Sequence, residues 1–178
     1  MPAMKILLFC GSLRKASFNR MLTNHALEAI GSRAEVQVAE IGDLPLYNQD
    51  IDADPLPESV QRLNRQVAWA DRYLFITPEY NYSIPGVLKN AIDWASRPRP
   101  NPFANKKAAI MSASPGMLGG ARCQYHLRQC FVFLDLVAIT SAEVFVSFAA
   151  DKFDENGKLN DDRTAKAIDK LLTALLAE

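Results

Sequence analysis

The chain has 178 residues, a length typical of one domain, and its 20 Lys and Arg residues balance 20 Asp and Glu residues. A formal net charge of zero does not favour binding to nucleic acid or to an anionic membrane surface. No apolar run approaches the ~20 residues of a membrane span, and residues 1–9 lack the pattern of a signal peptide. We therefore expect a single cytoplasmic domain over residues 1–178 that binds neither nucleic acid nor a membrane.

The three cysteines and two histidines show no metal-ligand spacing, so we expect no metal site. Cys123 and Cys130 fall on one expected helix, about 10 Å apart along its axis. A disulfide requires Cα atoms within about 7 Å, so this pair is too far apart to form one. Three reduced cysteines are typical of a cytoplasmic protein.

Apolar strand-like runs alternate with stretches of helical period along the chain. The expected strands are residues 5–10, 35–39, 73–77, 107–112 and 137–145. The expected helices are residues 17–30, 56–70, 85–95, 120–134 and 161–175, with Ser17 capping the first and Asp161 or Asp162 capping the last. This alternation predicts an α/β fold, a doubly wound parallel sheet of five strands in the flavodoxin-like order 2-1-3-4-5 with helices on both faces.

Ligands of such sheets bind beyond the carboxyl ends of the strands where the strand order reverses, here between the first and third strands. The loop after the first strand, residues 11–20, reads Gly-Ser-Leu-Arg-Lys-Ala-Ser-Phe-Asn-Arg. Its hydroxyls, its amide and the guanidinium of Arg14 stand at a helix start, which suits a phosphate group. The fingerprints of triphosphate and pyrophosphate loops are missing, so a monophosphate is expected.

Two other interpretations of this loop remain. A low-molecular-weight phosphatase would need five residues between its cysteine and arginine, whereas three separate Cys10 from Arg14 and the required position holds Ala16. The chain also lacks a matching late Asp-Pro acid, which makes the phosphatase interpretation weak. The other alternative is a capped helix start with an exposed arginine and no ligand.

The loop after the third strand, residues 77–86, reads Thr-Pro-Glu-Tyr-Asn-Tyr-Ser-Ile-Pro-Gly. Pro78 and Pro85 stiffen it, so the main chain between them offers donors and acceptors in fixed positions. Tyr80 and Tyr82 can supply an aromatic wall for a flat heterocycle such as an isoalloxazine ring. Glu79 is expected to act through its main chain, with a general base as the less favoured role. A tyrosine-rich surface turn is the alternative.

A third loop, residues 112–120, follows the fourth expected strand and is rich in glycine, which permits close approach to a ring. The helix start behind it would direct its positive dipole end toward the N1/O2 edge of a flavin.

The stretches Gly-Ser-Leu-Arg-Lys-Ala-Ser-Phe-Asn and Thr-Pro-Glu-Tyr-Asn-Tyr-Ser-Ile-Pro-Gly-Val-Leu-Lys-Asn-Ala-Ile-Asp-Trp are similar to those of the NADPH-dependent FMN reductase family. Residues 119–128 resemble in particular its chromate and quinone reductase branch. The likeness covers roughly residues 4–145. It implies a tightly bound FMN, NADPH or NADH as electron donor, and ping-pong, two-electron reduction of quinones, chromate, azo or nitro compounds, or flavin. Because the cofactor supplies the chemistry, no catalytic residue is expected.

By this resemblance, the residues that bind FMN are Ser12, Arg14, Ser17, Phe18, Asn19, Pro78, Glu79, Tyr80, Asn81, Tyr82, Ser114 and Gly116. Homodimers or homotetramers are also implied. We expect Arg122 and Tyr125, on one helix face, at a subunit contact together with Glu143.

The alternatives from other classes are a flavodoxin-type electron carrier and an FMN-based redox sensor. Carriers tend to be strongly acidic, and this chain is not. The choice between NADH and NADPH stays open, with Arg97 and Arg99 as candidates to meet a 2′-phosphate.

Overall fold

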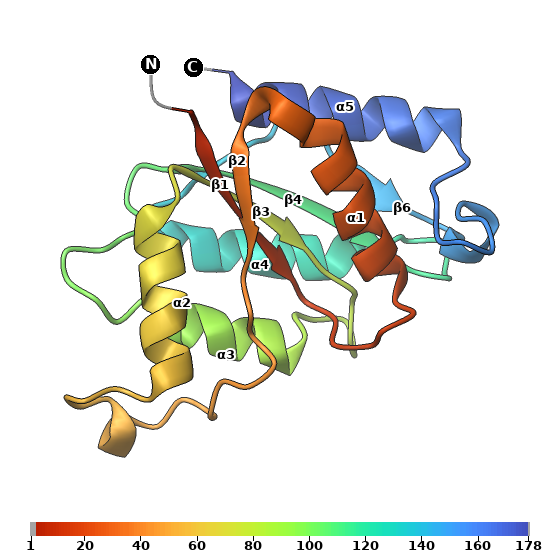
Figure 1. Ribbon diagram of the computed structural model, residues 1–178. Coiled ribbons are helices and arrows are strands. Elements are labelled where there is room, and N and C mark those ends of the chain that lie inside the picture. Colours follow the sequence, from red (N-terminus) through yellow and green to blue (C-terminus); the bar gives the residue numbers. More distant parts are fainter. Residues whose placement is uncertain (1–2, 178) are drawn as a thin grey trace.

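The computed structural model describes residues 3–177, whose strands form one parallel sheet (Figure 1). The strands are β1 (Lys5–Cys10), β2 (Glu35–Val38), β3 (Arg72–Ile76), β4 (Lys107–Ala113), β5 (Val137–Ala138) and β6 (Val144–Val146). Their order is β2-β1-β3-β4-β5, and β6 also pairs with β4. The predicted order 2-1-3-4-5 is confirmed.

The fifth expected strand, residues 137–145, is wrong as one continuous element. β5 pairs with Lys107 and Ala108 at the start of β4, while β6 pairs with the end of β4 from Met111 to Ala113. Residues 140–143 leave the sheet between them, and Thr140 and Ser141 are exposed there. Because this is an edge strand, which pairs on one side only, a polar interruption costs little.

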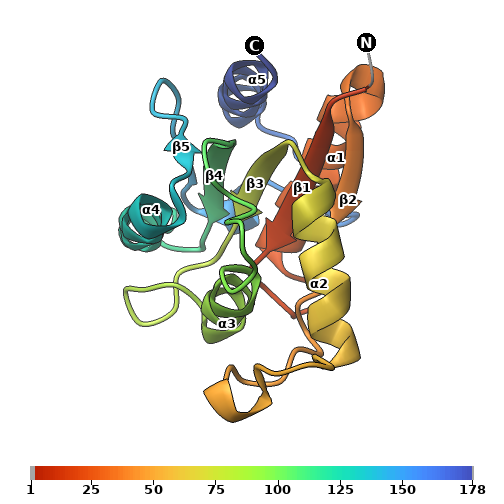
Figure 2. The same cartoon turned by 90° about the vertical axis from the view of Figure 1, so that its left-hand side faces the viewer.

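Five helices cover the two faces of the sheet, as Figure 2 shows. They are α1 (Phe18–Ile30), α2 (Glu58–Trp69), α3 (Gly86–Ala95), α4 (Ala121–Leu134) and α5 (Asp162–Leu176). Alternate residues of each strand point to opposite faces. Thus Ile6 and Leu8 pack with α1 and α5, whereas Leu7 and Phe9 pack with α2, α3 and α4.

The helix starts follow from local chemistry. The Ser17 hydroxyl accepts the main-chain N–H of Asn19 at 3.2 Å, and Asp161 accepts that of Thr164 at 2.8 Å, so both predicted caps are present. α2 begins at Glu58 and not at residue 56, because Pro57 disfavours helical geometry in the residue before it.

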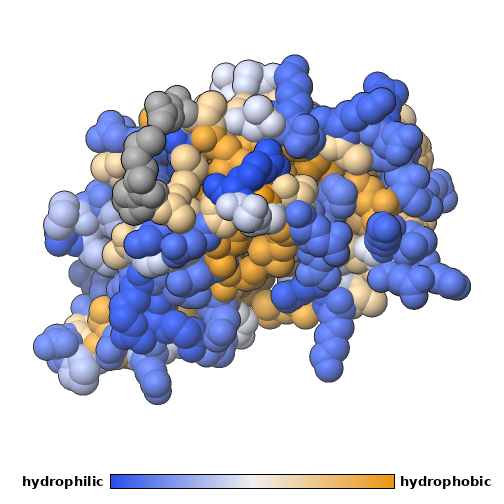
Figure 3. Space-filling model, turned by 45° about the horizontal axis from the view of Figure 1, so that its top comes forward, coloured by the Kyte–Doolittle hydropathy of each residue, from blue (hydrophilic) through white to orange (hydrophobic). Residues whose placement is uncertain are grey.

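The core on the α2–α4 side is aromatic. Phe9 stacks on Phe75 with ring centroids 4.8 Å apart, and the buried Trp94 donates its indole N–H to the carbonyl of Pro45 at 2.8 Å. On the face seen in Figure 3, polar side chains cover most of the surface and hydrophobic ones gather near the centre. Among residues 3–177, no helix has the length and apolar character needed to cross a membrane.

Candidate cofactor site at the carboxyl ends of the strands

Three loops meet at the carboxyl ends of β1, β3 and β4 and enclose a cavity of about 200 Å³. Nine of the expected residues line it: Ser12, Arg14, Ser17, Phe18, Asn19, Pro78, Glu79, Tyr80 and Ser114. Asn81, Tyr82 and Gly116 belong to the same loops but do not line the cavity. Ala113 and Pro115 do line it and were not among the expected residues. Both belong to the glycine-rich loop of residues 112–120, which was the signal for them.

The first loop presents main-chain donors. Gly11 donates its N–H to Ile76, but the N–H groups of residues 12–16 form no hydrogen bond to the described part of the chain. These free donors adjoin the start of α1, where the helix dipole is positive. The side chain of Arg14 bends back, so that its Nε and Nη2 donate to the carbonyl of Ala16, which leaves Nη1 free. The arrangement suits an anion.

The side chain of Asn19 binds the main chain of β4, a structural role that was not predicted from the sequence. Its Nδ2 donates to the carbonyl of Ala113 at 2.9 Å, and its Oδ1 accepts the N–H of Ala113 at 3.0 Å. This buried pair of bonds joins the start of α1 to the end of β4. One N–H of the amide group remains for a ligand.

The second loop turns tightly between Tyr80 and Ser83, which exchange two main-chain hydrogen bonds of 3.1 and 3.0 Å. Asn81 and Tyr82 both have positive φ, 51° and 68°, as in the two-residue turns of hairpins. Asparagine tolerates this conformation, but tyrosine is strained by it. The turn leaves Tyr80 50% exposed beside the cavity.

Glu79 connects the second loop to α4. One carboxylate oxygen accepts the main-chain N–H of Cys123 at 3.0 Å, and the other lies 3.2 Å from Nη1 of Arg122. The carboxylate of Glu79 therefore caps the start of α4, whose expected orientation toward the flavin stays a prediction. The guanidinium of Arg122 in turn lies 3.7 Å from the ring centroid of Tyr82.

The third loop depends on two glycines with positive φ. At Gly120, with φ of 86°, a Cβ would lie 2.8 Å from the Cβ of Ser112. The Ser112 hydroxyl donates to the carbonyl of Gly119, and the buried Gln124 donates to Ser112 and to the carbonyl of Val144. This network fixes the loop between β4, β6 and α4.

Tyr125, Arg97 and Arg99 lie outside the cavity. Tyr125 donates its hydroxyl to Glu143 at 3.3 Å within the chain. Arg97 and Arg99 follow the carboxyl end of α3, whereas the cavity lies at the other end of that ten-residue helix, about 15 Å away. Within one chain they do not adjoin the cavity.

Burial changes the pKa of one thiol near the site, that of Cys123. It raises the pKa of Cys123 to about 11, although a contact with the Thr77 hydroxyl opposes the shift. Cys10 is buried as well, with its Sγ 3.7 Å from the carbonyl of Ser12. Neither thiol has the arrangement of an activated nucleophile.

The residues present fit FMN. The enclosed 200 Å³, with the free N–H groups and Arg14, suits the phosphate end, whereas small-molecule pockets usually measure about 300–1,000 Å³. The larger ring would therefore lie at the open side, against the exposed Tyr80 and the rigid main chain of the second loop. A sheet with this strand order and this site defines a flavodoxin-like protein.

The comparisons with known proteins agree with this class. Residues 4–151 match the model of the NADPH-dependent FMN reductase family. The NAD(P)H-dependent FMN reductase PA1204 of Pseudomonas aeruginosa is 47% identical over 171 residues, which cover 96% of this chain and 92% of that protein. The NAD(P)H:quinone oxidoreductase of Solanum tuberosum is 46% identical over 182 residues, covering 99% and 93%.

A solved structure agrees as well. The flavoenzyme FerB of Paracoccus denitrificans, an NAD(P)H:(acceptor) oxidoreductase, superposes with a TM-score of 0.89 at 38% identity and covers 97% of this chain and 95% of its own. The chain belongs to the NADPH-dependent FMN reductase family. It is an oxidoreductase that uses FMN and NAD(P)H, which confirms the expected family and enzyme class.

Proposed function

We propose that the protein is an NAD(P)H:quinone oxidoreductase whose three loops would hold one FMN. When bound, this cofactor would supply the hydride-acceptor and two-electron donor chemistry that links the nicotinamide to a quinone. The observation that carries this proposal is the lining of the cavity. A loop with free N–H groups and the side chain of Arg14 lines one part of it, and Tyr80, which is 50% exposed, lines another. A ring held there is accessible to a second flat molecule.

The chain's own residues bind and orient. Arg14 and the main-chain N–H groups of residues 12–16 hold the phosphate, and Ser12 and Ser17 add hydroxyl donors. The main chain of residues 79–82, fixed by the turn at Tyr80 and Ser83 and by the bond from Glu79 to α4, holds the ring. Residues 113–115 also line the cavity, and the main-chain N–H of Ser114 donates to the carbonyl of Val146 in β6.

A flavin ring that is exposed beside Tyr80 has a kinetic consequence. Donor and acceptor stack on the same exposed face in turn, so we propose ping-pong kinetics. The same openness suits quinones and also chromate, azo and nitro compounds or free flavin. No side chain needs to transfer a proton as a catalytic acid or base.

The test is an anaerobic absorption spectrum of the FMN-loaded protein before and after addition of NADPH or NADH, and again after addition of a quinone. We expect the nicotinamide to bleach the flavin band and the quinone to restore it. A bound flavin that neither donor bleaches would favour the electron carrier or the redox sensor. Failure to bind FMN would reject the assignment of the cavity.

We further propose that the whole chain acts as one cytoplasmic domain in a homodimer or homotetramer. Three free cysteines support a reducing compartment. The outer face of α4 supports self-association, since Tyr125, Val132 and Phe133 are exposed on it beside Arg122. A Phe133→Asp variant should have a lower mass in solution than the wild type. If both proteins have the same mass, this face is not the contact.

A further inference from the structure

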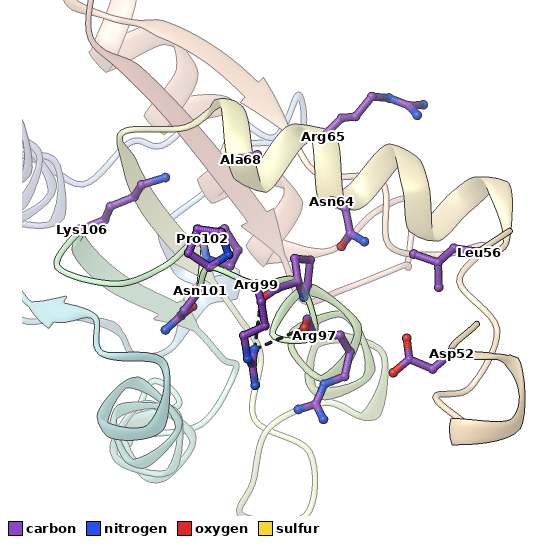
Figure 4. Close-up of a pocket in the computed structure, with 12 residues that line it drawn as sticks. Asp52, Leu56, Asn64, Arg65, Ala68, Arg97, Arg99, Asn101, Pro102 and Lys106 are labelled. Carbon is purple, nitrogen blue, oxygen red and sulfur yellow. Dashed lines mark hydrogen bonds between the residues drawn. The ribbon is translucent and has the colours of Figure 1, made fainter. Parts of the chain in front are cut away.

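A second cleft, larger than the cavity at the strand ends, lies between α2 and the loop of residues 97–102 (Figure 4). Its volume of about 720 Å³ falls within the range of small-molecule sites. Three prolines of the loop form one wall, and Leu56 and Ala68 belong to the opposite side. The cleft is remote from the flavin cavity, because α3 separates the two along its length.

The cleft carries two arginines whose positions are fixed without a carboxylate. Arg97 donates from Nε to the carbonyl of Asp93 and from Nη2 to the hydroxyl of Ser96, at 3.1 and 2.8 Å. Arg99 donates from Nη1 to carbonyls of its own loop. Within residues 3–177, Nη1 of Arg97 and Nε and Nη2 of Arg99 donate no hydrogen bond, while the Arg97 guanidinium lies 5.2 Å from the ring centroid of Tyr47. In Figure 4 both guanidinium groups extend from the loop on the side away from α2, and each keeps N–H groups with which to bind an anion.

Other charges around the cleft leave it positive. Asp52, the single acidic residue that lines it, accepts a hydrogen bond from the hydroxyl of Tyr47 at 3.1 Å. Lys106 lines the far end and donates its ammonium to the carbonyl of Ala70 at 2.6 Å. Arg65 is also in the lining, but Figure 4 shows its side chain extending away from the cleft.

A polar group faces the apolar walls. Asn64 of α2 lines the cleft, and its buried Oδ1 has no hydrogen-bond partner in the described part of the chain, nor has its Nδ2. A buried amide oxygen without a hydrogen-bond partner destabilises the folded state. A half-turn about the last side-chain bond exchanges the two atoms, so the amide can offer a donor or an acceptor to a ligand. An asparagine amide is complementary to the N6/N7 edge of adenine.

These features fit one class of ligand. We propose that the cleft binds an adenine nucleotide, with its phosphates on Arg97 and Arg99 and its base between the proline wall and Asn64. The volume accommodates a base, a ribose and phosphates. The apolar lining suits the flat base, and the fixed guanidinium groups suit the phosphates. This site is independent of the flavin chemistry, so its failure would leave the proposed function untouched.

The first test is calorimetric titration of the FMN-loaded protein with ADP. We expect saturable binding to one site per chain, and the Arg99→Gln variant should weaken it about tenfold or more. The matched control is Arg65→Gln, which removes the same charge from a side chain directed away from the cleft and should keep the affinity to within about twofold. Absence of saturation by about 1 mM ADP, or equal losses in both variants, would overturn the proposal.

The Asn64→Leu variant provides a second test that does not disturb the loop. It removes a buried group without a hydrogen bond, so we expect the melting temperature to be retained or raised. ADP should then bind no more tightly than inorganic diphosphate does, while the affinity for diphosphate itself stays the same. If Asn64→Leu binds ADP as the wild type does, the base is not recognised here and the proposal fails.

A kinetic control separates the cleft from the flavin face. ADP in the cleft should leave the NADPH concentration dependence of flavin bleaching unchanged. Competition between ADP and NADPH would assign the nucleotide to the donor site and refute the second site. If NAD⁺ binds in the cleft with the same affinity as ADP, the natural ligand is a dinucleotide. If ADP binds and NAD⁺ does not, the natural ligand is a free nucleotide.

Discussion

Replacement of Glu79 by glutamine tests whether the second loop depends on its attachment to α4. The side chain of Glu79 is 13% exposed and contacts both the N–H of Cys123 and the guanidinium of Arg122. Glutamine keeps the shape and one neutral hydrogen bond but loses the charge.

The magnitude follows from these two contacts. A hydrogen bond to a charged group contributes ~1.5–3 kcal/mol, and a neutral one ~0.5–1.5 kcal/mol. The ion pair adds under ~1 kcal/mol, because the side chain of Arg122 is 41% exposed and solvent screens it. We therefore expect Glu79→Gln to lower the free energy of unfolding by ~1–2 kcal/mol. For a chain of this size that corresponds to a melting temperature lower by ~2–8 °C.

The assay is thermal unfolding of the FMN-free and the FMN-loaded protein, together with a titration of FMN affinity. Since Glu79 fixes the loop that holds the ring, the affinity for FMN should fall along with the stability. The matched control is Asp93→Asn, which removes a carboxylate paired with Lys89 on the exposed side of α3 and should change stability by less than ~0.5 kcal/mol. If Glu79→Gln has the melting temperature of the wild type and binds FMN with the same affinity, the contact with α4 does not position the loop.

Three further predictions concern single residues. Arg14→Ala should weaken FMN binding about 10- to 150-fold and leave the hydride-transfer rate at saturating FMN near the wild-type rate; full FMN occupancy at limiting flavin would contradict the phosphate assignment. Gly120→Ala should lower the free energy of unfolding by at least ~1–2 kcal/mol in a denaturant titration, because φ is 86° and its Cβ would lie 2.8 Å from that of Ser112. Hydrogen bonds, first from Lys152, lower the pKa of Asp161 to about 2, below the ~3.9 of an unfolded chain. The charge therefore stabilises the fold above about pH 4, and this stability is lost as the pH falls toward 2. At pH 7 the free energy of unfolding of Asp161→Asn should be lower than that of the wild type, and the difference should become smaller as the pH falls from about 4 toward 2. A difference that does not change with pH would show that the charge is not responsible.

Local patterns along the chain were enough to predict the fold class and the three loops of the site. Apolar runs and helix-period stretches are local signals, and so are the caps at Ser17 and Asp161, because each depends on neighbours within a few residues. Long motifs in matching order also led to the family. Together these signals predicted nine of the residues that line the cavity.

Contacts between residues far apart in the sequence could not be predicted from these patterns. Asn19 bonds to Ala113, Glu79 caps α4 at Cys123, and the fifth strand divides where an edge position tolerates exposed polar residues. The cleft at Asn64 lies between a helix and a loop that are far apart along the chain. Such contacts depend on how the helices pack against the sheet, and the pattern of any one segment contains no information about the partner that its polar groups will find.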